Sequence, residues 1–263
     1  MPLQEGSFRR RIVRVLHGSS LLRRVAKRLG RGKTVQQPFH GGIICLDAVE
    51  HSWAWTGQNT YENFDRSQQD ALLALSRDHA WLVDIGCNLG AMTLGILLRN
   101  PHARSVSVDP NPRAVQLLQK SIEVNQLTDR AQVFQAAIAP AGAQVRFDFE
   151  GSVTGHVTAA GSPVATKTVA EVLASVPAGV APLIKVDVEG FETQFLAELA
   201  PLARARDAVL FLELHPAGMN GWGDPVKAIG TLREEQAVIT TFDGRAVTQV
   251  EPSANFQVVA RWR

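Results

Sequence analysis

The feature that most constrains the fold is a regular alternation of strand-like and helix-like segments from residue 81 onward. Short apolar runs predict strands at 81–85, 104–108, 131–136, 182–188, 208–214, 237–242 and 255–262. Apolar residues at helical spacing predict helices at 90–99, 112–125, 168–176, 190–203 and 225–236. The alternation predicts an α/β fold with a doubly wound, mostly parallel seven-stranded sheet. No convincing helix separates the last two strands, so we expect an antiparallel C-terminal hairpin.

The rest of the chain predicts additions around this core. We assign residues 1–40 to a basic helical extension and 41–263 to one domain, in which 41–80 forms a cap or lid region and 81–263 the core. A helix is expected after Asp65 or Ser67, either of which can cap it. The insertion at 144–168 is rich in Gly, Ser and Thr, and we expect a mobile hairpin or loop over the substrate.

The distribution of charge limits the choice of partner. Ten of the 27 basic residues lie within 1–33, where Glu5 is the only acid, so the remainder carries 17 bases against 24 acids. A net acidic body argues against a nucleic-acid partner. A weak peripheral membrane contact through the amphipathic residues 8–33 is one interpretation of the basic segment. We favour packing on the domain or on a second subunit, as in a homodimer.

Membrane insertion and secretion are not predicted. No apolar run approaches the roughly 18 to 20 residues of a membrane span, and the first residues lack the apolar centre of a secretory signal. Cys45 and Cys87 lie far apart and match neither a disulfide framework nor a zinc site. We therefore expect a cytoplasmic protein.

A glycine-rich turn joins the first core strand to its helix. The segment "VDIGCNLG" places Asp84, Gly86, Asn88 and Gly90 at alternate positions. Glycine permits a tight turn and lets a ligand approach the backbone, while the helix that follows presents free N–H groups. The spacing differs from the G-x-G-x-x-G of dinucleotide-binding folds, which argues against a dehydrogenase.

A second acidic residue suggests the ligand. Asp109 ends the next strand, 25 residues after Asp84. A carboxylate there can accept both ribose hydroxyls of a nucleoside, although alone it would be interpreted as a helix cap. Asp84 is expected to meet a cationic group. S-adenosylmethionine fits both positions, because it carries an ammonium group and has no pyrophosphate.

Five segments resemble the FkbM-type methyltransferases over residues 58–216. They are "VDIGCNLGAMTL", "VDPNPRAVQLLQKSIEVNQL", "FQAAIAPAGAQVRF", "LIKVDVEGFETQFL" and "LFLELHP". The resemblance implies a Rossmann-like class I methyltransferase fold, S-adenosylmethionine as donor, and O-methylation of a sugar, glycan or secondary metabolite. The chain departs from the family at Asp109, where Glu is commoner, and at Ala170, where an acid is common.

The resemblance also implies a set of cofactor-binding residues. They are Tyr61, Asp84, Gly86, Asn88, Gly90, Asp109, Asn111, Ala136, Ala137 and Asp187. In the aromatic segment before the core, Trp53, Trp55 and Tyr61 are expected either to stack on the adenine or a sugar, or to cover the sheet edge.

Ionisable residues gather at the ends of the fourth and fifth core strands. Transfer to an alcohol requires alignment of the hydroxyl with the methyl group and removal of its proton. Strand alternation places Lys185, Asp187 and Glu189 on one face, and Glu213 and His215 on one face. We predict His215 as the general base, with a pKa near the usual value of about 6.5, oriented by Glu213 or Glu189.

Two alternatives to this base are open. His215 can be a structural histidine, and Lys185 can simply pair with Glu189. Asp187, Glu189, Glu213 and His215 can also hold Mg²⁺. We favour the metal-free base, because imidazole is a poor ligand for a hard cation. The rival functions are an N-methyltransferase acting on a small molecule and a non-catalytic nucleoside-binding module.

Overall fold

The computed structural model describes residues 30, 32–52, 60–149, 155–216, 223–253 and 255–262. Residues 1–29 and 31 of the predicted basic helical extension lie outside these residues, as do Trp53 and Trp55, and Thr34–Phe39 forms a strand rather than a helix.

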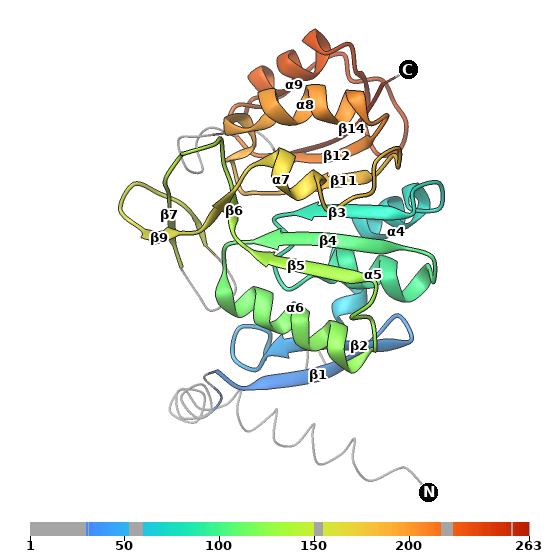
Figure 1. The fold of residues 1–263 in the computed structure, drawn as a ribbon, viewed down its shortest axis with the longest axis vertical. Coiled ribbons are helices and arrows are strands. Elements are labelled where there is room, and N and C mark those ends of the chain that lie inside the picture. Colours follow the sequence, from blue (N-terminus) through green and yellow to red (C-terminus); the bar gives the residue numbers. More distant parts are fainter. Residues whose placement is uncertain are drawn as a thin grey trace, which may run out of the picture.

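A seven-stranded sheet forms the centre of the protein, in the order β13-β14-β12-β11-β3-β4-β5 (Figure 1). Its strands are β3 (Trp81–Ile85), β4 (Arg104–Asp109), β5 (Ala131–Gln135), β11 (Leu183–Val186), β12 (Val209–Leu214), β13 (Val238–Thr240) and β14 (Phe256–Arg261). The first five are parallel, and β14 is antiparallel to both β12 and β13. The predicted fold class and the C-terminal hairpin are confirmed.

The strand order reverses at β3, which has β4 on one side and β11 on the other. In open α/β sheets such a reversal opens a crevice beyond the carboxyl ends of the strands, where ligands bind. The register aligns Lys185 of β11 with Asp84 of β3, so their strand ends lie side by side. This edge of the sheet is where the predicted site residues converge.

Helices cover both faces of the sheet, and two apolar clusters fill the space beneath them. One face carries α4 (Arg66–Leu75), α5 (Ala91–Arg99) and α6 (Pro112–Val124). The other face carries α7 (Val169–Leu173), α8 (Leu196–Ala205) and α9 (Pro225–Glu234). Strands buried on both faces read as continuous apolar runs, which made the core strands recognisable in the sequence.

The predicted helix at 190–203 begins later than expected. A short 3₁₀ helix, η2 (Glu192–Gln194), precedes α8, which starts at Leu196. Glu189 and Gly190 have φ angles of 53° and 100°, outside the range of a right-handed helix. This turn lets Glu192 reach the site described below.

The caps of two helices leave aspartates uncommitted. Asn111 caps α6, and its side chain accepts hydrogen bonds from the N–H groups of Arg113 and Ala114, so Asp109 is not the helix cap that it could have been if taken alone. Asp65 occupies the N-cap position of α4 but makes no side-chain capping bond, and its φ is 44°. Both aspartates therefore have side chains available for other contacts.

A β-hairpin precedes the core. β1 (Thr34–Phe39) pairs with β2 (Gly42–Asp47), and the hairpin lies beside α6 (Figure 1). Arg113 of α6 donates to Asp47 at 2.9 Å. The proposed domain boundary after residue 40 falls at the turn of this hairpin, so β1 belongs structurally with the residues that follow it.

The insertion after β5 forms small sheets. β6 (Ala137–Ile138) pairs with β10 (Thr166–Lys167), while β7 (Val145–Asp148) pairs with β8 (His156–Val157) and β9 (Ser162–Val164). Figure 1 shows β7 and β9 on the side toward which the arrowheads of β3, β4 and β5 point. The insertion is therefore hairpin-like, and it lies toward the carboxyl edge of the sheet.

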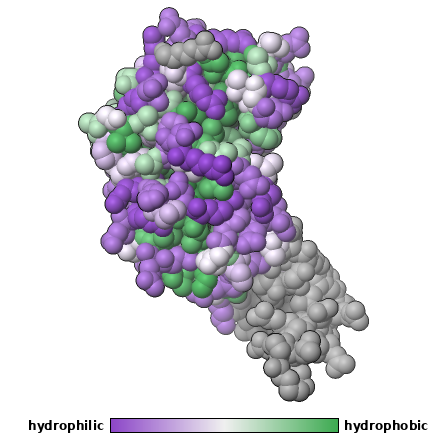
Figure 2. Space-filling view, turned by 90° about the vertical axis from the view of Figure 1, so that its right-hand side faces the viewer, coloured by the Kyte–Doolittle hydropathy of each residue, from purple (hydrophilic) through white to green (hydrophobic). Residues whose placement is uncertain are grey.

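The edge at which the parallel strands begin is mostly hydrophilic. Figure 2 shows the side that faces right in Figure 1, where the parallel strands begin, and hydrophilic side chains cover most of it. Among the helices of the described residues, none has the length and apolar character needed to cross a bilayer.

Candidate active site

A series of cavities follows the carboxyl edge of the sheet from β5 to β14. A cavity of about 30 Å³ lies beside Ala136 and Ala137, and the next, of about 120 Å³, lies beside Asp109 and Asn111. A third, of about 230 Å³, contains His215. Neighbouring cavities share lining residues, including Gly86 and Val188 for the first pair and Gly86 and Asn88 for the second. The edge therefore carries a continuous trough.

The glycine turn borders this trough, and one of the two reasons expected for its glycines holds. Gly86, Asn88 and Gly90 have φ angles of 76°, 49° and 80°. A Cβ on Gly86 would overlap the carbonyl group of Asp187, and one on Gly90 would overlap the side chain of Leu118. The prediction of a tight turn is confirmed. The predicted clearance for a ligand is wrong, because both missing Cβ atoms would point into protein.

Substituting Gly90 tests this packing. Gly90→Ala should lower the free energy of unfolding by about 2 to 3 kcal/mol, from roughly 1 to 2 kcal/mol of backbone strain and roughly 1 kcal/mol for displacing Leu118. Gly142 is the matched control, because its φ is 77° and nothing lies within 4 Å of its missing Cβ. Urea unfolding should show a smaller loss for Gly142→Ala. Equal losses would contradict the role of Leu118.

Asp84 lies behind the trough rather than in it. Its side chain is fully buried and borders none of these cavities. Oδ2 accepts a hydrogen bond from Thr93 at 2.7 Å, and Oδ1 lies 3.5 Å from Nζ of Lys185. The cation that Asp84 meets is thus a lysine of the protein, not a ligand as predicted.

Asp109 and Asn111 face the 120 Å³ cavity. Asp109 accepts from the N–H groups of Asn88 at 2.7 Å and Asn111 at 2.8 Å. Burial raises the pKa of Asp109 to about 6, although the two backbone hydrogen bonds oppose the shift. Asn111 is 3% exposed, and its Nδ2 has no hydrogen-bond partner among the described residues. A buried donor of this kind is costly unless a ligand satisfies it.

The remaining predicted cofactor residues flank the trough. Ala136 and Ala137 are buried, and their N–H groups bond to the carbonyls of Asp109 and Ala165. Tyr61 begins the 3₁₀ helix η1 (Tyr61–Asn63) and borders the 230 Å³ cavity. Its ring packs against Phe39 and Phe64, and burial raises the pKa of its hydroxyl group.

His215 is held by a residue that the sequence interpretation did not assign a role. Its Nδ1 lies 2.7 Å from Oε1 of Glu192, and both side chains are buried. Nε2 points toward Glu189 at 3.5 Å and Asp187 at 3.9 Å. Glu213, one of the two residues predicted to orient His215, instead accepts hydrogen bonds from Gln68 at 2.8 Å and Gln257 at 3.1 Å.

The cluster is strongly acidic. Burial by itself lowers the pKa of His215, but the hydrogen bond with Glu192 and the charges of Glu192, Asp187 and Glu189 outweigh it and raise the pKa to about 9. The predicted ordinary histidine pKa is therefore wrong. Burial, with the charge of Asp187, raises the pKa values of Glu189 and Glu213.

The same cluster offers ligands for a metal ion. Asp187, Glu189 and His215 each bring one donor atom within 4.8 Å of the others, and Glu213 is not part of this group. One imidazole nitrogen and two carboxylates suit Mn²⁺, Fe²⁺ or Zn²⁺ better than Mg²⁺. Of the four ligands considered from the sequence for Mg²⁺, the structure therefore brings only three together among the described residues.

Three residues of the site carried only faint sequence signals. Glu192 lies three residues after Glu189 in the segment "VEGFE", the most distinctive part of the chain. Gln68 is a buried polar residue on α4. Asp65 borders the His215 cavity, and burial together with the charge of Asp187 raises its pKa.

Comparisons with known proteins concern part of the sequence and the fold. Residues 57–149 match the family model of the methyltransferase small domain, and no curated protein matches the chain. The solved structure of M. jannaschii TYW2 in complex with AdoMet is 12% identical, with a TM-score of 0.51 over 88% of this chain and 86% of that chain.

Two further structures are less similar in shape. Precorrin-6y C5,15-methyltransferase from Geobacter metallireducens GS-15 is 12% identical, with a TM-score of 0.44 over 75% of this chain and 88% of that chain. The O-methyltransferase from Bacillus cereus in complex with SAH is 12% identical, with a TM-score of 0.41 over 74% and 81%.

The fold is that of the class I methyltransferases. The family model and the fold together support an enzyme of the methyltransferase class with S-adenosylmethionine as its cofactor. The narrower FkbM-type assignment stays a prediction.

Proposed function

We propose that this chain is an S-adenosylmethionine-dependent O-methyltransferase of the FkbM type that methylates a hydroxyl of a sugar, glycan or secondary metabolite. One observation carries the proposal. A buried histidine, His215, is fixed through Nδ1 by Glu192 and points Nε2 into the trough. The same trough contains the Nδ2 group of Asn111, which lacks a hydrogen-bond partner among the described residues, and the acceptor carboxylate of Asp109. A nucleoside site and a proton acceptor thus share one sheet edge.

Residues along the trough would hold the cofactor. Asp109, whose carboxylate keeps free lone pairs beyond its two backbone bonds, would accept from the ribose, and Asn111 would donate to it from Nδ2. The apolar wall at Ala136 would take the adenine. Asp187, which has a 26% exposed side chain, would meet the ammonium group of the methionine end.

Methyl transfer takes place beside His215. The acceptor oxygen attacks the methyl carbon in line with the sulfur, the carbon–sulfur bond breaks, and the proton of the hydroxyl passes to Nε2. Because Nδ1 is hydrogen bonded to Glu192, the neutral imidazole presents Nε2 as its basic nitrogen. Glu192 then stabilises the imidazolium ion that forms.

The two rival functions predict different behaviour. An N-methyltransferase on a small molecule needs less help from a base, so the His215–Glu192 pair favours the O-methyltransferase. A non-catalytic nucleoside-binding module needs no histidine beside the cofactor.

Incubation with S-adenosylmethionine carrying a labelled methyl group tests the proposal. A panel of sugars, glycosides and hydroxylated aromatic compounds should yield a methyl ether and S-adenosylhomocysteine, identified by mass spectrometry and NMR. Cofactor turnover that places the label on nitrogen would identify the N-methyltransferase instead. Binding of S-adenosylhomocysteine without turnover of any acceptor class would favour the binding module.

Asp109→Ala should weaken S-adenosylhomocysteine binding by about 1 to 3 kcal/mol, because charged hydrogen bonds to the ribose are lost. Asp129→Ala, an exposed residue away from the trough, is the control. In the wild type, calorimetric affinity should also fall as the pH drops through about 6, where Asp109 becomes protonated. Unchanged affinity in Asp109→Ala would remove Asp109 from the cofactor site.

A further inference from the structure

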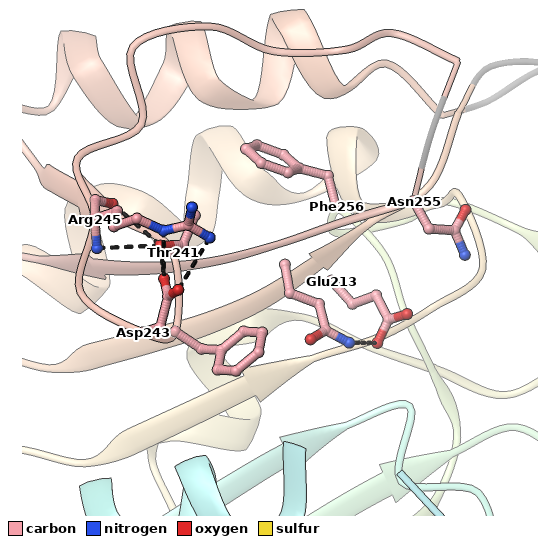
Figure 3. Close-up of a pocket in the computed structure, with 8 residues that line it drawn as sticks. Glu213, Thr241, Asp243, Arg245, Asn255 and Phe256 are labelled. Carbon is pink, nitrogen blue, oxygen red and sulfur yellow. Dashed lines mark hydrogen bonds and ion pairs between the residues drawn. The ribbon is translucent and has the colours of Figure 1, made fainter. Parts of the chain in front are cut away.

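A fourth cavity, of about 410 Å³, continues the trough beyond His215. It lies where the end of β12 meets the start of β14 and the segment after β13, and its lining residues are Glu213, Thr241, Phe242, Asp243, Arg245, Asn255, Phe256 and Gln257 (Figure 3). Its volume falls within the usual range of about 300 to 1,000 Å³ for small-molecule sites. None of the cofactor residues discussed above borders it.

Two residues connect this cavity to the proposed transfer site. Glu213 and Asn255 line both the 410 Å³ cavity and the cavity that contains His215. A ligand in the fourth cavity can therefore extend a hydroxyl group past Glu213 to His215. The fourth cavity itself lies at β12 and β14, whereas the proposed cofactor residues lie at the ends of β3, β4 and β5, so a ligand in it would approach His215 from the side opposite the cofactor.

Hydrogen bonds hold Glu213 in place at this junction. Gln68 and Gln257 both donate to its Oε2, at 2.8 and 3.1 Å. Its Oε1 accepts no hydrogen bond from the described residues. Oε1 is also not one of the fully buried polar atoms of these residues that lack a partner, so it is accessible. A fixed carboxylate oxygen that is open to the cavity is a suitable acceptor for a ligand hydroxyl group.

The charges around the cavity disfavour an anionic ligand. Among the described residues that line it, Arg245 is the one basic side chain, and Asp243 already neutralises it through contacts of 3.0 and 3.2 Å, as Figure 3 shows. Thr241 donates to Asp243 and accepts from the N–H of Arg245, which completes the small network. Glu213 leaves the lining with an excess of negative charge.

Aromatic residues also border the cavity. Phe242 has a 45% exposed side chain, whereas the ring of Phe256 packs partly against the apolar cluster beneath α7, α8 and α9 and points away from Glu213 (Figure 3). The amide side chains of Asn255 and Gln257 offer donors and acceptors nearby. An exposed ring face beside uncharged amides and a carboxylate suits a ligand with apolar C–H faces and several hydroxyl groups.

We propose that this cavity binds a neutral, hydroxyl-rich ring of the methyl acceptor, a sugar unit, with the ring packed on Phe242 and its hydroxyls bonded to Glu213 and the amides. The inference rests on the proposed function, because it places the acceptor beside His215. It narrows the acceptor class to neutral carbohydrates, free or as part of a larger glycoside, and excludes phosphorylated sugars and nucleic acids.

Saturation-transfer NMR on the full chain with saturating S-adenosylhomocysteine provides the test. The probes are a panel of neutral methyl hexosides and the corresponding hexose 6-phosphates. At least one neutral hexoside should bind, and Phe242→Ala should weaken it by about 3- to 10-fold, the worth of one ring contact. Val238→Ala, a 40% exposed position on β13 outside the cavity, should bind like the wild type.

Three results would overturn the inference: no binding of any neutral hexoside, tighter binding of the phosphates, or equal affinity in Phe242→Ala and wild type. Calorimetry with S-adenosylhomocysteine separates this failure from failure of the proposed function. Cofactor binding with no hexoside binding rejects the sugar cavity alone. Phe242-dependent hexoside binding in a chain that binds no S-adenosylhomocysteine supports the cavity and rejects the methyltransferase.

Discussion

Replacing His215 with alanine should lower kcat by about 10²- to 10⁴-fold, the usual contribution of a general base. The affinity for S-adenosylhomocysteine should change by less than about twofold, since the proposed ribose and adenine contacts lie at Asp109, Asn111 and Ala136. Single-turnover kinetics with a methylated product would give the first value and calorimetry the second. A variant with nearly full activity would make His215 a structural histidine.

The pH profile distinguishes a base from a residue that only supports the fold. A histidine with a raised pKa is protonated below that pKa, so the basic form of His215 accumulates only as the pH rises toward about 9. In the wild type, kcat/KM should therefore increase with pH and level off above about 9. Glu192→Gln removes the charge that does most to hold the proton, so it should move this inflection to lower pH. An unmoved inflection would mean that another group titrates.

Chelation tests the alternative role of the same cluster. A metal-free base should keep its activity in the presence of a chelator. Activity that is lost on chelation and returns with Mn²⁺ would assign Asp187, Glu189 and His215 as ligands, with the ion lowering the pKa of the acceptor hydroxyl. Glu192 would then orient the histidine ligand through Nδ1, as carboxylates do in many metal sites.

The fold was predictable because its signals are local. Buried parallel strands and amphipathic helices leave periodic patterns within ten or fifteen residues, and each core strand was placed within two residues of its position. The delayed start of α8 was not predictable, because Glu189 adopts a positive φ that non-glycine residues rarely take. Sequence periodicity contains no trace of such a turn.

The site was only partly predictable, because its hydrogen bonds join distant segments. The sequence placed Asp187, Glu189, Glu213 and His215 at neighbouring strand ends, and the structure does bring them together. It did not reveal the contact of Glu213 with Gln68, 145 residues away, nor that Glu192, rather than the predicted Glu213 or Glu189, bonds to Nδ1 of His215. The pKa of His215 depends on three carboxylates, and it could not be read from the residue type.

Lys185→Met should lower the free energy of unfolding by about 3 to 5 kcal/mol, the usual cost of leaving a buried charge without its partner. Lys185 is 3% exposed, and Nζ lies 3.3 Å from Asp187, 3.4 Å from the carbonyl of Gly86 and 3.5 Å from Asp84. Asp84 is fully buried, so removing the lysine leaves its carboxylate buried without a counter-charge.

The exposed Lys227 on α9 supplies the control, since Lys227→Met should change stability by less than about 0.5 kcal/mol. Unfolding in guanidinium chloride measures the free energy of unfolding of all of these variants. Adding Asp84→Asn to Lys185→Met should recover at least half of the loss, because the stranded charge is then removed. A double variant no more stable than Lys185→Met would show that the lysine stabilises the fold through its packing rather than through the charge of Asp84.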